Sequence, residues 1–173
     1  MGGLIAAHVA FRDPGAWAAV VLSGPATRIG SQIDDAPVAP DCAHGFKALP
    51  KLAVRSLDID LISGNRPVVE LAKQDPFRVS VPLTARYGAE MMRAIDDVWK
   101  NMERSTFPLL IVHGSKDLLC AVGGSRRVME LAFSTDKRLI EYEGLMHEVL
   151  TEVTWRRVLS DIQGFLDGHC LSR

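Results

Sequence analysis

Two polar segments, each following an apolar run, contain residues that could perform acid–base chemistry. Residues 113–117 (HGSKD) follow the run 109–112 (LLIV), and residues 143–148 (EGLMHE) follow the run 138–142 (RLIEY). An aspartate can accept a hydrogen bond from Nδ1 of a histidine and hold the ring in the tautomer that a general base requires. Asp117 and His147 are therefore candidates for a catalytic acid–base pair. Asp117 could instead cap a turn, and a loop histidine is more often simply solvated.

The order of these two residues favours the catalytic interpretation. Ligands of open parallel sheets bind beyond the carboxyl ends of the strands, where both segments are expected to lie. Asp117 follows one predicted strand, and His147 follows the next, 30 residues later. This is the Asp…His part of the Ser…Asp…His order of α/β-hydrolases.

The remaining pattern predicts the elements that would position this pair. Short apolar runs at 18–22, 109–112 and 138–142 are typical of strands buried in a parallel sheet. Amphipathic or apolar segments at 2–12, 125–133 and 155–166 predict helices. The order predicts an α/β fold, the C-terminal part of an α/β-hydrolase core, with flanking helices.

A long segment separates the first predicted strand from the second. We assign residues 1–26 and 106–173 to the partial core and residues 27–105 to a helical cap or lid insertion. Within the insertion, 46–57, 67–73 and 84–104 are predicted helices, after a loop rich in proline and polar residues. Insertions of this length usually carry function rather than merely connect strands.

Four stretches resemble the monoacylglycerol lipases of the α/β-hydrolase superfamily. They are MGGLIA at 1–6, ISGNRPVVELAKQDPF at 62–77, HGSKDLLC at 113–120 and YEGLMHEVLTE at 142–152. The resemblance implies that Asp117 is the triad acid and His147 the triad base. It also implies that the backbone N–H of Met1 forms half of the oxyanion hole. We interpret Cys120 as a small buried residue near the site.

The resemblance also indicates where the nucleophile belongs. The sequence has no G-x-S-x-G, but Met1-Gly2-Gly3 matches the residues that follow the serine of such a motif. The serine is thus expected immediately before Met1. Ser23 and Ser115 lack the flanking glycines of a nucleophile elbow and are not expected to replace it. We therefore expect the 173-residue chain alone to be neither active nor stable as a hydrolase, because one sheet edge would lack its neighbour.

The implied function is hydrolysis of carboxylic esters, foremost of monoacylglycerols to a fatty acid and glycerol. Lysophospholipase, aminopeptidase-like and general esterase activities share the same triad and stay open. A non-catalytic fragment or binding module is the alternative from another class. An in-frame G-x-S upstream of Met1 would favour the enzyme, and a stop codon there the fragment.

The composition excludes several other classes of function. A net charge of −1 with 24% charged residues excludes nucleic-acid binding driven by net charge. No apolar run approaches the roughly 18 residues of a membrane span. Cys42, Cys120 and Cys170 form no CxxC pair, and the histidines form no HExxH, so we expect no metal and no cofactor. Unpaired cysteines favour a cytoplasmic location. Transient membrane contact through the cap and the oligomeric state stay open. We interpret His8 and His113 as structural residues.

Overall fold

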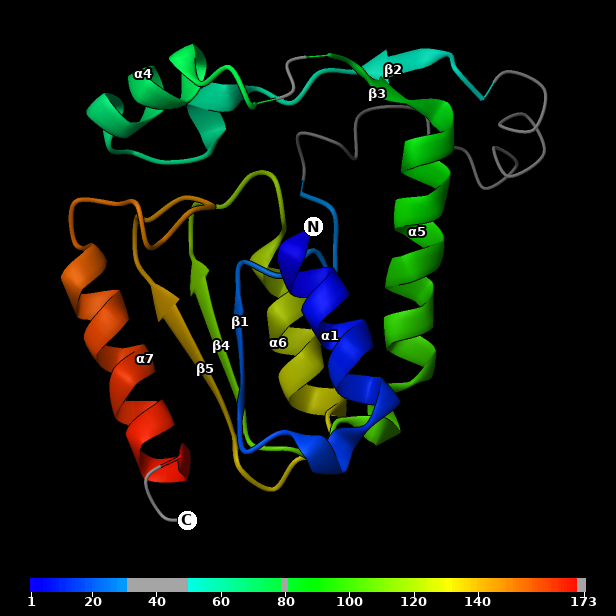
Figure 1. Cartoon of the computed structure of the whole chain (residues 1–173), viewed down its shortest axis with the longest axis vertical. Helices are drawn as coiled ribbons and strands as arrows, with labels where there is room; N and C mark the ends of the chain where they lie inside the picture. The colour runs from blue at the N-terminus through cyan, green and yellow to red at the C-terminus, as the bar shows by residue number, and fades with distance from the viewer. Residues whose placement is uncertain (31–49, 79–80, 171–173) are drawn as a thin grey trace.

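The computed structural model describes residues 1–30, 50–78 and 81–170, and its centre is a three-stranded parallel sheet (Figure 1). The strands are β1 (Val20–Ser23), β4 (Leu109–Gly114) and β5 (Lys137–Tyr142), in the order β1-β4-β5. Both pairings are parallel, so the three carboxyl ends lie at one edge of the sheet. The predicted fold class and all three predicted core strands are confirmed.

The central strand β4 explains why the sequence shows a continuous apolar run. Leu110, Ile111 and Val112 are fully buried, because β4 has a strand on each side and helices on both faces. Leu109 and Ile111 pack in one core cluster and Leu110 and Val112 in another. A strand buried on both faces has no solvent-facing positions and therefore no polar alternation.

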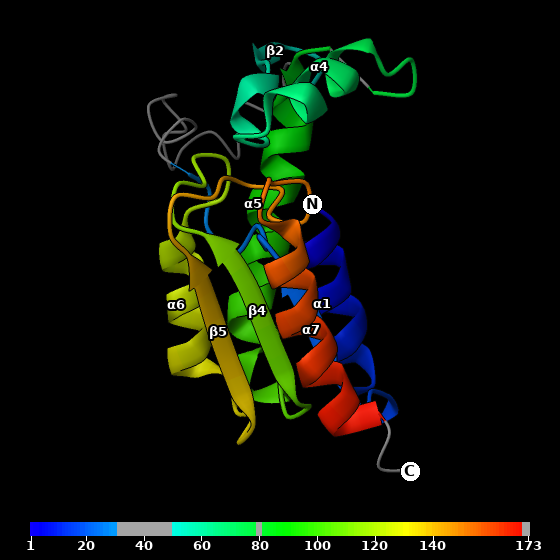
Figure 2. The same ribbon diagram turned by 90° about the vertical axis from the view of Figure 1, so that its left-hand side faces the viewer.

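Three predicted core helices are confirmed within a few residues. They are α1 (Gly2–Arg12), α6 (Val122–Leu131) and α7 (Trp155–Cys170). Residues of α1 and α6 share the core cluster that contains Leu109 and Ile111. Residues of α7 share the cluster that contains Leu110 and Val112, so α7 covers the opposite face of the sheet (Figure 2).

The segment between β1 and β4 has two parts (Figure 1). Its short elements lie above the carboxyl ends of the strands, and its long final α-helix packs against the core. This helix, α5 (Ala85–Lys100), runs beside α1, and Nε2 of His8 on α1 lies 2.9 Å from the carbonyl oxygen of Ala94 on α5. Ile95, Val98 and Met102 also join the core cluster of α1. The elements of this segment are β2 (Ala53–Arg55), α4 (Arg66–Gln74), β3 (Leu83–Thr84), α5 (Ala85–Lys100) and the 3₁₀ helices Ile59–Leu61 and Met102–Arg104. Another 3₁₀ helix, Pro14–Ala16, follows α1.

One predicted helix is wrong. Residues 53–55 of the expected helix 46–57 form β2, which pairs antiparallel with β3. The N–H groups of Ala85 and Arg86 also donate to the carbonyl groups of Leu52 and Pro50. Pro50 has no N–H to continue a helix and would collide with the preceding turn, whereas the partner strand satisfies the backbone. Residues 46–49 and Cys42 lie outside the described residues.

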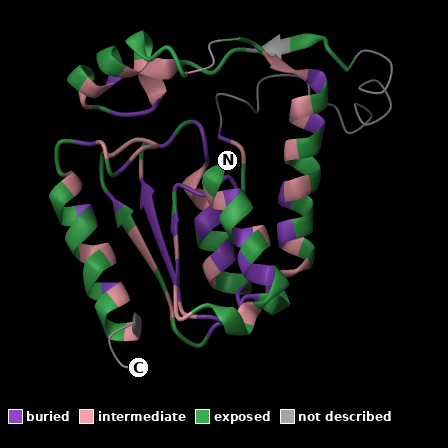
Figure 3. Ribbon diagram, viewed as in Figure 1, coloured by how far each residue is buried: buried purple, intermediate pink, exposed green. Residues whose placement is uncertain are grey.

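The burial pattern separates the core from the elements above it. Figure 3 shows buried residues on β4 and on the inward sides of α1, α5 and α6, while α4 is largely exposed or half-buried. Three apolar side chains of the segment 71–81 are well exposed, namely Leu71, Phe77 and Val81. Across the described residues, no helix has the length and apolar character needed to cross a membrane.

Candidate active site

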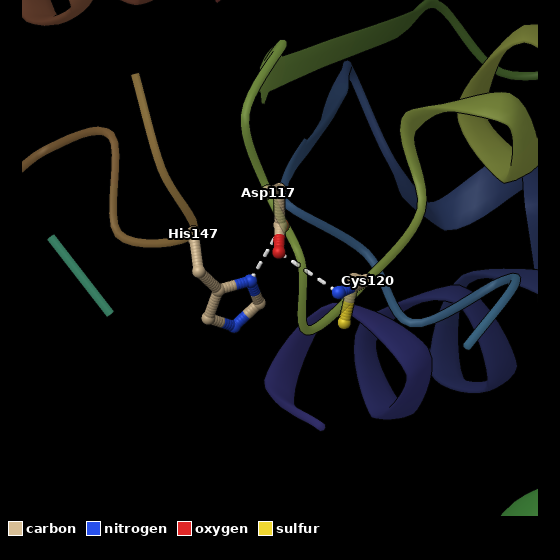
Figure 4. Close-up of side chains that lie close together, drawn as sticks. All are labelled: Asp117, Cys120 and His147. Atoms are coloured by element: carbon tan, nitrogen blue, oxygen red, sulfur yellow. Dashed lines mark hydrogen bonds and ion pairs between the residues drawn. The ribbon is translucent and has the colours of Figure 1, made fainter. Parts of the chain in front are cut away.

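Asp117 and His147 lie in the loops that follow β4 and β5, and Figure 4 shows their side chains facing each other. Nδ1 of His147 lies 2.7 Å from Oδ2 of Asp117. The Asp117 side chain is fully buried, whereas the His147 side chain is 22% exposed. The N–H of Lys116 donates to the carbonyl of Leu145, which joins the two loops directly. A ring held by its Nδ1 leaves Nε2 free to exchange a proton with a reacting group.

Asp117 both caps a turn and orients His147. Its Oδ1 accepts hydrogen bonds from the backbone N–H groups of Leu119 and Cys120, at 2.9 and 2.8 Å. Its Oδ2 faces His147 at 2.7 Å and Nε2 of His113 at 3.1 Å. The two interpretations of Asp117 from the sequence are therefore compatible, because each uses a different carboxylate oxygen.

His113 is a buried structural partner of Asp117. Its Nδ1 lies 2.7 Å from Oγ of Ser125, and its Nε2 lies 2.9 Å from the carbonyl oxygen of Cys120. Because Nε2 faces only acceptors, it carries the proton, and Nδ1 accepts the Ser125 hydroxyl. The structural interpretation of His113 is confirmed, as is that of His8 on α1.

The pair changes the proton affinity of both groups. Burial alone would raise the pKa of Asp117, but hydrogen bonds from His113 and His147 hold that pKa below its ordinary value. Burial alone would lower the pKa of His147, but the hydrogen bond to Asp117, followed by the Cys120 side chain, raises it to about 10. The geometry thus stabilises the imidazolium that forms when His147 takes a proton.

Two glycines let the backbone approach this pair. Gly24, after β1, has a φ of +47°, and a Cβ there would lie 3.0 Å from the carbonyl oxygen of His147 and 3.2 Å from its Nδ1. A Cβ at Gly114 would collide with the carbonyl oxygens of Leu145 and Met146. Both positions require glycine for space, and Gly24 also requires it for its backbone conformation. Neither glycine was predicted from the sequence as part of the site, although each lies just after an apolar run.

Met1 and Cys120 were also named from the sequence. Met1 lies at the start of α1, where its carbonyl accepts the N–H groups of Leu4 and Ile5. Cys120 is buried, as expected, and its thiol, a carboxylate oxygen of Asp117 and a ring nitrogen of His147 lie within 4.8 Å of one another. The structure thus places Cys120 beside the pair (Figure 4).

A cavity of about 450 Å³ borders His147 on the side of the insertion. Both basic side chains of its wall, Arg78 and Lys73, form ion pairs: Arg78 with Glu148 at 3.2 Å, and Lys73 with Asp60 at 3.1 Å. The carboxylate of Asp58 also lines the cavity. Much of the remaining wall is apolar, provided by Leu57, Ile59, Ile62, Val81, Leu83 and Leu119. Such a cavity suits a ligand with an apolar part and an uncharged polar part.

The family described as "Serine aminopeptidase, S33" matches residues 1–154. The chain belongs to this family of α/β-hydrolases. The chain is similar to the monoacylglycerol lipase of Mycolicibacterium smegmatis, with 35% identity over 97% of this chain and 59% of that protein. It is also 32% identical to the human monoglyceride lipase, over 89% of this chain and 52% of the relative. The resemblance to the monoacylglycerol lipase family seen in the sequence is confirmed.

Solved structures of α/β-hydrolases share the fold. The monoacylglycerol lipase of Paleococcus ferrophilus superposes with a TM-score of 0.81 at 25% identity, over 96% of this chain and 65% of that one. A monoglyceride lipase variant from Saccharomyces cerevisiae gives 0.82 at 22% identity, over 96% and 62%. This α/β-hydrolase chain spans about half to two thirds of the length of these relatives.

Proposed function

We propose that this chain supplies the acid and base of a serine hydrolase that cleaves monoacylglycerol-like esters. The observation that carries the proposal is the 2.7 Å contact between His147 Nδ1 and Asp117 Oδ2 beside a cavity. The names of its relatives in Mycolicibacterium smegmatis and humans support an ester of glycerol as the substrate.

The geometry fits the proton transfers of ester hydrolysis. A serine hydroxyl attacks the ester carbonyl while Nε2 of His147 accepts its proton, and Asp117 holds the ring by Nδ1. The backbone N–H of Met1 donates to the oxygen that becomes negative. His147 then returns the proton to the leaving glycerol oxygen. Water completes the cycle by the same route and releases the fatty acid.

The paired charges of the cavity favour an uncharged head group. Because Glu148 neutralises Arg78 and Asp60 neutralises Lys73, a phosphate would have to compete with a carboxylate for either of these two cations. A glycerol head group instead needs hydrogen bonds without net charge. We therefore rank monoacylglycerols above lysophospholipids as substrates.

The insertion also supports transient contact with a lipid surface. Leu71, Phe77 and Val81 are 69%, 93% and 66% exposed, and Val81 also lines the cavity. Apolar side chains in such positions can enter a membrane interface and guide a lipid substrate toward His147. Sedimentation with neutral lipid vesicles measures this contact, and Phe77→Ser is expected to weaken it. Equal binding by both proteins would count against this role.

The test of the function begins with the DNA upstream of the Met1 codon. An in-frame G-x-S immediately before Met1 defines a longer protein, which is then assayed on monoacylglycerol, lysophosphatidylcholine and an aminoacyl amide. We expect turnover of monoacylglycerol, lost in Asp117→Ala and His147→Ala. His169→Gln is the control, because His169, on α7, contacts Asp136, which precedes β5, away from the site. Full activity of His147→Ala would refute the role of His147 as the base. No turnover by the longer protein, or a stop codon before Met1, would support a non-catalytic role instead.

A further inference from the structure

The loop that carries His147 is joined to the insertion by a buried carboxylate. Glu152 is 6% exposed, and its Oε1 accepts two backbone hydrogen bonds at 2.9 Å. One donor is the N–H of Gly64, in the insertion, and the other is the N–H of Met146, the residue before His147. We call these three residues the Glu152 clamp. It fixes the peptide that leads into His147 against a segment more than 80 residues away.

A buried carboxylate is a costly way to join two loops. Burying an ionised group is unfavourable unless hydrogen bonds replace the lost water. Within the part of the chain that the structure describes, Glu152 forms no salt bridge. Its carboxylate instead accepts hydrogen bonds from the backbone N–H groups of Gly64 and Met146. A carboxylate that accepts backbone N–H groups imposes a defined geometry on both donors. Precise placement of Met146 is the gain that such an arrangement offers.

Neighbouring contacts extend the same junction. The N–H of Glu148 donates to the carbonyl of Ile62 at 2.7 Å, and Nδ2 of Asn65 donates to the carbonyl of Thr151 at 3.0 Å. Ile62 also packs against Leu119, whose N–H donates to Asp117. The segment 62–65 therefore touches both loops that carry the acid–base pair.

We propose that Glu152 is a positioning residue that sets the ring of His147 through Met146 and couples it to the insertion. This role rests on the proposed function of His147 as the base. Ile62 and His147 both border the cavity. A ligand that moves the segment 62–64 therefore also moves the donor pair on Glu152 and, through Met146, the base.

Histidine NMR on the longer protein tests the positioning without requiring turnover. The proton on Nδ1 of His147 reports its hydrogen bond to Asp117, and its loss in Asp117→Asn assigns the signal. We expect Glu152→Ala to shift or abolish this signal. Glu152→Gln should retain it, because one amide oxygen can accept both N–H groups. Gly64→Ala should also shift it, since its Cβ would lie 3.2 Å from Oε2 of Glu152.

Asn65→Ala is the matched control at the same junction. It removes the bond to Thr151 but leaves the Glu152 clamp intact, so the His147 signal should persist. An unchanged signal in folded Glu152→Ala would overturn the proposal, as would an equal loss in Asn65→Ala. Should Glu152→Ala fail to fold, Gly64→Ala decides, and an unchanged His147 signal there overturns the proposal.

Activity separates this inference from the function on which it rests. In the longer protein, Glu152→Ala should lower kcat on the order of 100-fold with little change in KM, the cost of a small misplacement of a catalytic group. Glu152→Gln should restore most of kcat. If the wild-type protein hydrolyses no ester but the NMR contrast persists, the proposed function fails and the positioning stands. If esters are hydrolysed and Glu152→Ala leaves kcat unchanged, only the positioning fails.

Discussion

Asp117→Asn is the most informative perturbation of the acid–base pair. An asparagine oxygen can still accept the N–H groups of Leu119 and Cys120, so the turn should survive. Its amide nitrogen, however, faces the ring of His147 and donates to Nδ1. The ring proton then moves to Nε2, the nitrogen that must accept the proton of the nucleophile. A wrong tautomer of this kind lowers kcat on the order of 10⁴-fold.

The same substitution should remove a pH-dependent part of the stability. The hydrogen bond to Asp117 and the Cys120 side chain together raise the pKa of His147 from 6.5 to about 10, so the part due to Asp117 is at most roughly 5 kcal/mol, at about 1.4 kcal/mol for each tenfold change in proton affinity. Because the folded pKa is raised, this stabilisation is fully present below pH 6.5 and lost as the pH rises to about 10. The pKa of Asp117 is lowered in the folded protein, so its contribution to stability is present at higher pH and is lost as the pH falls below about 4.

Two measurements follow from these signs. In the longer protein, urea unfolding from pH 5 to pH 10 should show the wild type losing stability as the pH rises, and Asp117→Asn should flatten that dependence. In the longer protein, kcat should rise with pH toward 10, because only neutral His147 accepts a proton. A titration of His147 with the same pKa in Asp117→Asn as in the wild type would refute the reasoning.

Three further substitutions test other parts of the structure. Gly24→Ala should displace His147, lower kcat at least tenfold and shift the His147 NMR signal. A wild-type kcat and an unchanged signal would contradict the close approach of Gly24 to His147. Leu110→Ala should cost about 2–5 kcal/mol in urea unfolding, because its fully buried side chain leaves a cavity in the core; a loss below about 1 kcal/mol would show that the site collapses. Glu148→Gln should leave Arg78 unpaired and raise kcat/KM for lysophosphatidic acid relative to monoacylglycerol; an unchanged ratio would exclude Arg78 from the head-group site.

The core was predictable because local sequence and tertiary position agree there. The run 109–112 has no polar residue, and the structure buries it on both faces as β4. The segment 46–57 was not predictable in the same way. Its residues 53–55 form a strand because residues 83–84 offer backbone partners, and no local pattern records a pairing between segments about 30 positions apart.

The acid–base pair was predictable because topology alone brings it together. Parallel strands align their carboxyl ends, so residues that follow neighbouring strands must meet there. The two functions of Asp117, by contrast, emerged only from the structure. Both its turn and its contact with His147 depend on how the residues after β4 fold back.

Glu152 and Gly24 show what a motif search overlooks. Neither carries out chemistry, and their roles depend on contacts with distant backbone: Glu152 with Gly64, and Gly24 with His147. Because backbone N–H and carbonyl groups are the same at every residue, the sequence gives no sign of which of them a side chain will meet. The placement of His147 relative to Asp117 therefore depends on Glu152 and Gly24, whose residue types alone predict only an acidic side chain and a turn.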